Sequence, residues 1–475
     1  MVHLLMEEKV VQTILKPRNG RYDVPSPVQG AEGWLVCVLR TGDVPSEDGI
    51  LYLVSAESGE NLSLGIRAPS GTMVRDEGLY RLIFPDSGED SVLRLCVSET
   101  IPFDASRTET MLRAADSEWT SAWRDPQISR ADGGWLLLCG AVRKGEGKGR
   151  RGCIARFYSS DLQNWQELPP LADNCGLSCA PGAPGLFTIC GLEYLLYTAL
   201  SDRVGTRYFF RRTGETGWHR PANDLLDSRA FLYGRSFAEK PDGILCCGIL
   251  PSRDCDHWHY SPAGYMGHDY NTWDLGGSVL LHFLSAGEDG ALLCRPVPQE
   301  DTVDVPLSGQ PLNGNWVCSG DGLRAVSPGG AAHLLFDRLL PERCELALEV
   351  LPEDGCRRLG LMLFADEGFA EAYCLYIEPD RNRVQLRSPF RMTEDGSWAF
   401  PQEIELEQHY PASAGRAIRL VLRRNGPAAR LWINGSCMSF RVEDRTFGRP
   451  GLSVSHGTAA WQRIRLSVPR EDLPV

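Results

Sequence analysis

The chain contains 475 residues, of which 43% are hydrophobic and 23% are charged, and it carries a formal net charge of −13. A chain of this length is expected to form two or three domains with large hydrophobic cores. The negative charge argues against a nucleic-acid groove or an anionic membrane surface as the partner. No apolar run approaches the roughly twenty residues of a membrane-spanning helix. The sequence therefore predicts a globular protein that binds neither nucleic acid nor membranes.

Many of the sixteen cysteines lie within apolar runs, for example at residues 136–139 and 244–247. In such runs cysteine acts as a small hydrophobic residue. The N-terminal segment includes Glu7, Glu8 and Lys9 and has no long apolar core, so it does not resemble a signal peptide. A reduced, cytoplasmic protein is therefore predicted.

Short runs of β-forming residues, bounded by Gly, Pro, Asp and Asn, recur along the first part of the chain. In chain order they occupy residues 34–39, 51–54, 79–84, 92–97, 135–139, 153–158, 193–200, 207–210 and 243–250. Regular short strands separated by turn signals indicate an all-β sandwich, barrel or propeller. Because these units are too many for one sandwich, residues 1–298 are predicted to form a β-propeller of four-stranded blades.

The composition changes after the sequence Arg-Pro-Val-Pro at residues 295–298. Residues 299–312, rich in Asp, Gly, Pro and Gln, are predicted to be a linker. Further strands follow at residues 344–350, 359–364, 417–422 and 429–433. The alternation of apolar and charged residues over 418–423 is typical of a sheet with one face in water. Residues 313–475 are therefore predicted to form a β-sandwich.

The most informative motif is Trp123-Arg124-Asp125-Pro126, followed by a strand and a Ser-x-Asp-Leu-x-x-Trp turn at residues 159–165. Together with residues 69–74 and 273–298, in this order and spacing, the motif resembles glycoside hydrolase family 32, the invertases and fructan hydrolases. The resemblance covers almost the whole chain. It implies a five-bladed β-propeller joined to a C-terminal β-sandwich, a small carbohydrate ligand such as a β-fructofuranoside, and no cofactor.

The resemblance assigns Asp125 to the aspartate that holds sugar hydroxyl groups. Arg124 beside it favours the ionised carboxylate, and Pro126 stiffens the turn that presents it. An Arg-Asp pair that only ties a turn is the alternative. Ser70 and Tyr233 lie in segments similar to other pocket segments of the family and are predicted, with Arg124, to contact the sugar.

The nucleophile of the family is an aspartate near the N-terminus, and its counterpart here lies within residues 20–27. When these residues are aligned on the proline, Val24 takes the place of the aspartate and Asp23 precedes it. A slip of one residue moves a side chain to the other face of a strand. Asp23 is therefore predicted to act in the pocket if a β-bulge restores the register, and to cap a loop as an Asx turn otherwise.

The proton donor of the family is a glutamate, and its position falls on Gly182, which cannot transfer a proton. A second acidic motif of the family appears here as residues 231–234, again without its carboxylate. Glu193 lies too far along the next strand to act as a substitute. Proton donors that remain open are Glu239, Asp254, Asp256 and His257.

Residues 254–260 form a further candidate segment. In an extended strand, Cys255, His257 and His259 share one face, and His268 follows shortly. Such residues could hold a metal ion or provide a histidine acid/base. Because no established metal spacing is matched, no metal is predicted. The favoured interpretation is a polar pocket loop in which Trp258 stacks on a sugar ring and His257 contacts it.

Three functional hypotheses follow. The first is a divergent glycoside hydrolase in which Asp23 attacks and Asp125 binds sugar hydroxyls. The second is a catalytically inactive sugar-binding or regulatory protein that has lost the acid/base. The third is a pseudo-enzyme that acts through oligomer contacts of its sandwich. The sequence leaves the substrate, the linkage and the oligomeric state open.

Overall fold

The computed structural model describes most of the chain between residues 21 and 472 and divides it into two compact units. The described ranges are 21–29, 34–41, 49–55, 60–86, 91–145, 149–201, 204–240, 242–251, 276–296, 301–319, 322–353, 355–366, 372–387, 391–392, 399–400, 404–411, 417–442 and 446–472. No helix among these ranges is both long and apolar enough to cross a membrane. The described residues up to Leu293 belong to the first unit, and those from Cys294 onward belong to the second.

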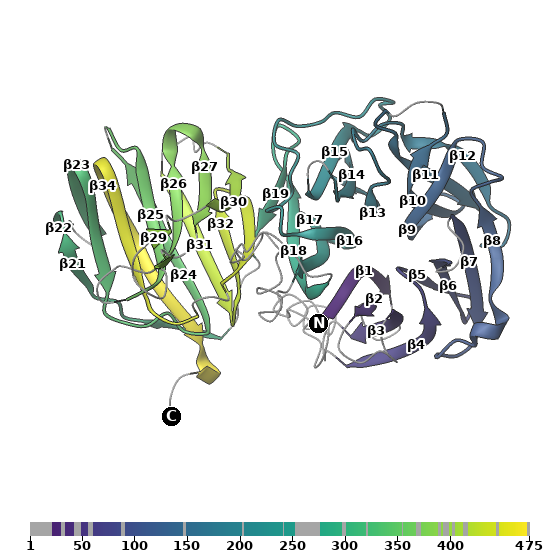
Figure 1. Cartoon of the computed structure of the whole chain (residues 1–475), viewed down its shortest axis with the longest axis horizontal. Helices are drawn as coiled ribbons and strands as arrows, with labels where there is room; N and C mark the ends of the chain where they lie inside the picture. Colours follow the sequence, from purple (N-terminus) through teal and green to yellow (C-terminus); the bar gives the residue numbers. More distant parts are fainter. Residues whose placement is uncertain are drawn as a thin grey trace. The chain divides into compact units, whose positions relative to one another are not determined.

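The first unit is a ring of antiparallel sheets, each a blade of consecutive strands (Figure 1). Blade 1 contains β1 (Arg21–Gln29), β2 (Trp34–Thr41), β3 (Ile50–Ser55) and β4 (Asn61–Arg67); blade 2 contains β5 (Thr72–Asp76), β6 (Leu79–Pro85), β7 (Val92–Ser98) and β8 (Glu109–Arg113). Blade 3 contains β9 (Thr120–Ala131), β10 (Gly134–Arg143), β11 (Gly152–Ser159) and β12 (Gln166–Ala172). Blade 4 contains β13 (Gly182–Ile189), β14 (Leu192–Ala199) and β15 (Gly205–Arg212), and blade 5 contains β16 (Leu232–Lys240), β17 (Gly243–Pro251), β18 (Gly277–Ala286) and β19 (Leu292–Arg295).

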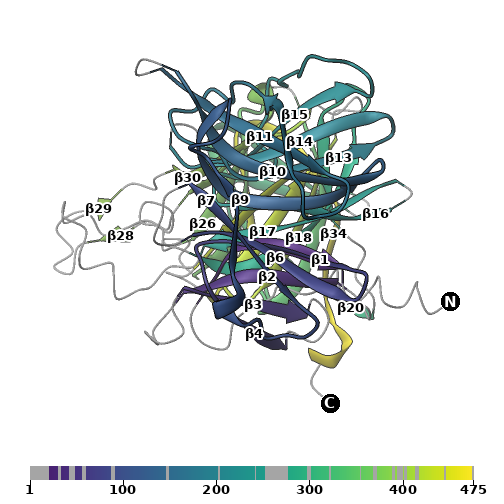
Figure 2. The ribbon, with the colours of Figure 1, turned by 90° about the vertical axis from the view of Figure 1, so that its right-hand side faces the viewer.

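The first strand of every blade lies next to the centre of the ring. β1 contacts β5, β5 contacts β9, β9 contacts β13, β13 contacts β16, and β16 contacts β1, so the five inner strands close a circle (Figure 1). The ring is also closed by pairing, because β1 of the first blade pairs with β18 of the last at Tyr22 and Gly277. Figure 2 shows β1 to β4 side by side in blade 1.

Apolar side chains between neighbouring blades form the core of this unit. One cluster joins blades 1 and 2, a second joins blades 2 and 3, and a third joins blades 3 and 4. Blades 3 and 4 approach closely at Gly140, where a Cβ atom would lie 1.6 Å from the backbone oxygen of Pro181. Only glycine fits at this position, because any side chain would push the two blades apart.

Four inner strands carry a β-bulge near the centre of the ring. In β1 the register of the strand pairing shifts between Asp23 and Ser26, and in β9 it shifts opposite Leu138 to Gly140 of β10. In β13 it shifts between Gly182 and Gly185, and in β16 between Leu232 and Arg235. One non-glycine residue at each bulge has a positive φ: Val24 (42°), Asp125 (48°), Ala183 (43°) and Tyr233 (55°). Such strained residues are typical of functional sites. A bulge also re-aims the side chains beside it.

The second unit is built on one long strand, β34 (Arg449–Pro469), which pairs in turn with β25, β23, β24 and β20. A strand that changes partners in this way forms a corner between two packed sheets. The remaining strands are β20 (Thr302–Val305), β21 (Gly309–Asn313), β22 (Asn315–Ser319), β23 (Gly322–Phe336), β24 (Arg343–Pro352), β25 (Arg358–Ala365), β26 (Tyr373–Glu378), β27 (Arg383–Arg387), β28 (Arg391–Met392), β29 (Ala399–Phe400), β30 (Ile404–His409), β31 (Ile418–Asn425), β32 (Ala428–Ile433) and β33 (Ser436–Arg441). Short 3₁₀ turns, η1 (Ala105–Arg107), η3 (Pro379–Arg381) and η4 (Arg470–Asp472), complete the described elements of the chain.

The predicted fold class, a five-bladed β-propeller followed by a β-sandwich, is confirmed. Residues 299–312, predicted as a linker, contain β20 and most of β21, which pair with β34 and β23. The predicted boundaries at residues 298 and 313 stay a prediction.

Candidate active site

Asp23 is placed at the centre of the ring by the bulge in β1 that the sequence analysis required. Its side chain is buried, with 5% of the residue exposed, and Oδ1 accepts a hydrogen bond of 2.9 Å from the backbone N–H of Val24. Burial raises the pKa of Asp23 from an ordinary value of 3.8 to about 6; the Val24 hydrogen bond opposes the shift, and the nearby charge of Asp125 adds to it. Asp23 is therefore a carboxyl group that gains or loses its proton near neutral pH.

Asp125 lies at the bulge of β9 and is 3% exposed. Its Oδ2 accepts a hydrogen bond of 3.1 Å from Nε of Arg124 and one of 3.3 Å from the backbone N–H of Ala183 in the next blade. The charge of Asp125 raises the pKa of Arg124. Because the Arg124 side chain is 38% exposed, the pair has a buried anionic end and a cationic end open to water.

Gly182, at the position predicted to lack the proton donor, lies beside Asp125 and Tyr233. A Cβ atom on Gly182 would lie 2.9 Å from Oδ2 of Asp125 and 3.0 Å from Cε1 of the Tyr233 ring. The ring therefore fills the space that a side chain at residue 182 would need.

Tyr233 comes from the bulge of β16 and is buried. Its backbone N–H donates a hydrogen bond of 2.8 Å to Oγ1 of Thr198. Burial holds the pKa of the phenol above its usual range, and the charges of Asp125 and Asp23 raise it further, while the charge of Arg124 acts in the opposite direction. The edge of the Tyr233 ring and Oδ2 of Asp125 both lie beside Gly182.

A buried arginine, which the sequence analysis missed, supports this cluster from the interior. Arg235 is 0% exposed, and its Nη1 donates hydrogen bonds to Oγ of Ser26 (3.2 Å) and the backbone oxygen of Pro126 (2.8 Å). Nη2 donates to the backbone oxygen of Asp125 (3.1 Å). Burial lowers the pKa of Arg235, and the charge of Asp125 partly offsets the effect. One guanidinium group therefore fixes the strands that carry both Asp23 and Asp125.

The sequence did contain a signal for these positions. Val24, Asp125 and Ala183 each precede a proline, and a proline within a strand is typical of a bulge because it cannot donate a ladder hydrogen bond. In three inner strands the positive-φ residue is followed directly by a proline. This repeated pattern indicates a bulge at the same central position of each strand. Arg235 had no comparable signal.

The predicted site residues have different outcomes. The structure brings Asp23, Arg124, Asp125 and Tyr233 into one cluster. Ser70 is buried just before β5, where its Oγ has no hydrogen-bond partner among the described residues. The segment predicted to line the pocket, with Cys255, His257, Trp258, His259 and His268, lies outside the described residues, as do Asp254, Asp256 and the Glu239 side chain.

The Ser-x-Asp-Leu-x-x-Trp turn after β11 is a structural element. Oδ1 of Asp161 accepts hydrogen bonds from the backbone N–H groups of Gln163 (2.9 Å) and Asn164 (2.8 Å), so its carboxylate closes the turn. Trp165 packs against the apolar cluster between blades 2 and 3, which includes Trp123. This part of the motif therefore anchors the turn between β11 and β12 in the blade whose first strand, β9, carries Asp125.

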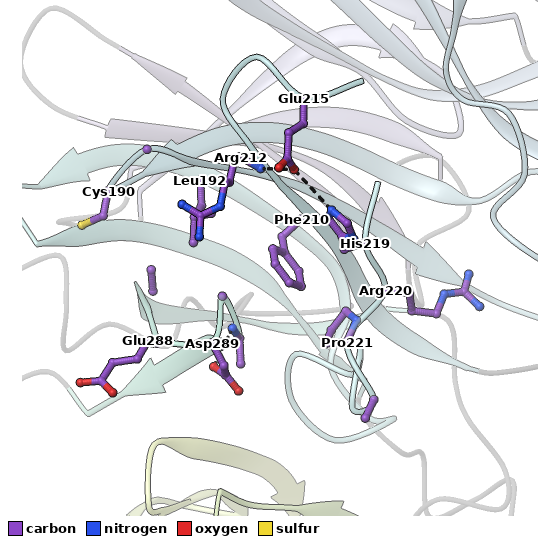
Figure 3. A pocket seen from close by; sticks show the side chains of 16 residues that line it. Cys190, Leu192, Phe210, Arg212, Glu215, His219, Arg220, Pro221, Glu288 and Asp289 are labelled. Atoms are coloured by element: carbon purple, nitrogen blue, oxygen red, sulfur yellow. Dashed lines mark hydrogen bonds and ion pairs between the residues drawn. The ribbon is translucent and has the colours of Figure 1, made fainter. Parts of the chain in front are cut away.

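A concave region lies at the edge of blade 4 and encloses about 820 Å³. Figure 3 shows Glu215 between Arg212 and His219: its carboxylate accepts a hydrogen bond of 3.0 Å from the Arg212 backbone N–H and lies 3.3 Å from Nε2 of His219. Glu288 and Asp289, from the turn after β18, line the other side. The charges are mixed and none of these residues belongs to the central cluster.

Known proteins resemble this chain in sequence and in fold. No protein-family model matches the chain. Raffinose invertase of Escherichia coli is 23% identical over 358 residues, which cover 64% of this chain and 71% of that protein. Sucrose-6-phosphate hydrolase of Lactobacillus gasseri superposes with a TM-score of 0.64 at 14% identity, over 98% of this chain and 96% of the other.

Two further solved structures have a similar fold. The family-32 β-fructofuranosidase BmSUC1 of Bombyx mori gives a TM-score of 0.63 at 13% identity and covers 100% of this chain and 98% of its own. A variant of that enzyme, which gives a TM-score of 0.61 at 13% identity over 97% of this chain and 96% of its own, is solved in complex with sucrose. The chain has the family-32 glycoside hydrolase fold. Within this family-32 fold, the inner strands of the propeller carry the carboxyl cluster described above.

Proposed function

We propose that the chain is a glycoside hydrolase that binds a β-fructofuranoside, or a similar small glycoside, at the centre of the propeller. The observation that supports this most directly is the pair of buried carboxyl groups, Asp23 and Asp125, which lie on different blades and interact electrostatically. Two neighbouring carboxyl groups are the usual machinery for cleaving a glycosidic bond. The proposed location is cytoplasmic, because many of the cysteines lie in apolar runs, for example at residues 136–139 and 244–247, where cysteine acts as a small hydrophobic residue.

In this proposal Asp23 attacks the anomeric carbon and forms a covalent glycosyl intermediate, which water then hydrolyses. Asp125 accepts hydrogen bonds from ring hydroxyl groups, and these bonds strengthen as positive charge develops on the sugar. Arg124 keeps the carboxylate of Asp125 oriented through its 3.1 Å hydrogen bond. The buried positions of both carboxyl groups increase the strength of these interactions, because water screens them poorly there.

Asp125→Asn is the first test. It keeps the volume of the side chain but removes the charge, so kcat/KM for sucrose is expected to fall by about 100-fold or more, in line with the loss of charged hydrogen bonds. Calorimetric titration with fructose should show weaker binding in parallel. Asp132→Asn, on the exposed turn between β9 and β10, is the matched control and should leave both quantities unchanged. Undiminished hydrolysis by the Asp125 variant would contradict its assigned role.

Activity is also expected to fall as the pH drops below about 6. The nucleophile must be ionised, and the pKa of Asp23 is raised to about 6 by burial and by the neighbouring Asp125, with Arg124 acting in the opposite direction. Protonation below this pH therefore removes the attacking oxygen. Measuring kcat/KM for sucrose between pH 4 and pH 8 tests the expectation. An acid limb centred near pH 4 would contradict it.

A second candidate function is sugar binding without hydrolysis, which Gly182 favours because a carboxylate is missing from the expected donor position. A panel of sucrose, raffinose, short fructans and aryl glycosides separates the two functions. Release of sugar supports the hydrolase. Binding in calorimetry without release from any substrate supports the binding protein.

A further inference from the structure

One threonine hydroxyl inside the propeller joins the two strands that carry the proposed catalytic carboxyl groups. Thr72 begins β5, which contacts both β1 and β9 in the circle of inner strands (Figure 1). Its Oγ1 accepts a hydrogen bond of 3.2 Å from Oγ of Ser26 in β1 and one of 3.3 Å from the backbone N–H of Ile128 in β9. Thr72 is 1% exposed and Ser26 is 0% exposed, so both hydroxyl groups are shielded from water.

The two hydrogen bonds lie at the same distance along the chain from the two carboxyl groups. Ser26 is the third residue after Asp23, and Ile128 is the third residue after Asp125. Val24 and Asp125, at the bulges of these strands, have a positive φ, a strained conformation that persists only when the surrounding structure holds it. The threonine therefore fixes both strands just beyond their strained residues.

Arg235 sets the direction of these hydrogen bonds and closes them into a ring. An arginine can only donate, so Oγ of Ser26 accepts the bond of 3.2 Å from Nη1 of Arg235 and donates its own hydrogen to Thr72. Nη1 also donates to the backbone oxygen of Pro126 in β9. The bonds thus run from β16 through β1 and β5 to β9, and from β16 directly to β9. Thr72 is the member of this ring that comes from a blade without a carboxyl group of the pair.

We infer that Thr72 is a positioning residue that sets the distance between the carboxyl groups of Asp23 and Asp125; this rests on the hydrolase function proposed above. Without the threonine hydroxyl, the Ser26 hydroxyl and the Ile128 N–H would lose their acceptor, and buried donors move to find another partner. Each move shifts a strand that carries one carboxyl group. A displacement of about 1 Å at a catalytic group can lower the rate by about 100-fold.

Thr72→Val keeps the shape of the side chain and removes the hydroxyl group. For sucrose, kcat should fall by about 10-fold or more because the carboxyl groups are misplaced, while KM should stay within about threefold. Thr72→Ser retains the hydroxyl and should restore kcat to within about threefold of the wild type. Ser26→Ala breaks the same link from the side of β1 and should lower kcat in the same way. A residue that only stabilised the fold would not separate kcat from KM.

The placement of Asp23 can also be measured without a substrate. The difference in unfolding free energy between the wild type and Asp23→Asn changes with pH through the pKa of Asp23. Burial raises this pKa to about 6 and the charge of Asp125 adds to the shift, while the Val24 hydrogen bond and Arg124 oppose it. When Thr72→Val is added to both proteins, the pH at which the difference develops should fall by about half a unit or more, because the carboxyl groups separate and water reaches Asp23.

The control is Thr110→Val, the same substitution on β8, the outer strand of the same blade, where the hydroxyl accepts an exposed hydrogen bond from Arg94. It should change neither kcat nor the pH dependence. If Thr72→Val keeps kcat within about twofold, or if Thr72→Ser does not restore a loss, the inference is overturned. Ser26→Ala decides if Thr72→Val does not fold. If the wild type releases no sugar, the hydrolase function fails; an unchanged pH dependence then overturns the inference as well, whereas a lowered one supports the positioning of Asp23.

Discussion

Asp23→Asn is expected to abolish hydrolysis and at the same time to stabilise the folded protein at neutral pH. The amide cannot attack the anomeric carbon, so kcat/KM should fall by about three orders of magnitude or more. The stability gain follows from burial, which disfavours the ionised carboxylate and raises the pKa of Asp23 to about 6. Asparagine has nearly the same shape and can still accept the hydrogen bond that Val24 donates.

The raised pKa of Asp23 determines how the free energy of unfolding changes with pH. Because the pKa of Asp23 is raised in the folded state, the unfavourable effect of its charge is absent well below pH 4, where the carboxyl group is protonated in both the folded and the unfolded state, and it is small at pH 4 itself. It develops as the pH rises toward 6 and is constant above. From an ordinary pKa of 3.8 and a folded pKa of about 6, the full effect amounts to about 2–3 kcal/mol.

The measurement is the free energy of unfolding in urea, determined at pH 4 and at pH 7 for the wild type and the variant. The variant should be clearly more stable at pH 7 and nearly equal to the wild type at pH 4. Asp132→Asn, on an exposed turn, supplies the control for loss of a surface charge. A difference that is the same at both pH values would show that the charge of Asp23 is not the cause.

Arg235→Met is expected to destabilise the propeller by about 4 kcal/mol. The guanidinium group donates to Ser26 Oγ and to the backbone oxygens of Asp125 and Pro126, all of them buried. Methionine fills most of the volume but leaves these acceptors without donors, at a cost of about 1–3 kcal/mol each. The removal of a desolvated charge offsets part of this loss.

Urea denaturation at pH 7 measures this effect. Arg235→Lys, which keeps the charge but not the planar fork of donors, should fall between the wild type and the methionine variant. Arg107→Met is the control, because that side chain is 77% exposed. A loss below about 1 kcal/mol for Arg235→Met would mean that the strands of blades 1 and 3 hold their positions without the arginine.

The strand pattern predicted the fold because it is a local property of the sequence. Alternating apolar residues and turn residues recur in every blade, and each blade buries its apolar faces against the next. The Arg124–Asp125 pair could be predicted from the sequence in the same way, since the two residues are adjacent and proline follows them. In both cases the determining residues lie within a few positions of each other.

The rest of the cluster depends on contacts between distant residues. Arg235 reaches Ser26 across 209 positions and Pro126 across 109, and no local pattern marks such a contact. The Asp23 side chain could be predicted only as conditional on a bulge, because the register depends on how β1 pairs with β2. The exclusion of a side chain at residue 182 depends on a tyrosine ring from another blade.

The pairing of β1 with β18 has a consequence for the order in which the protein matures. Asp23 leaves the ribosome early, but Tyr233 and Arg235 belong to the last blade, and the first strand, which also pairs with β2, can pair with β18 only after Gly277 has been made. Contacts between such remote parts of a chain form late and slowly. The nascent polypeptide can therefore fold several blades first, and the proposed catalytic groups meet only when the last blade closes the ring.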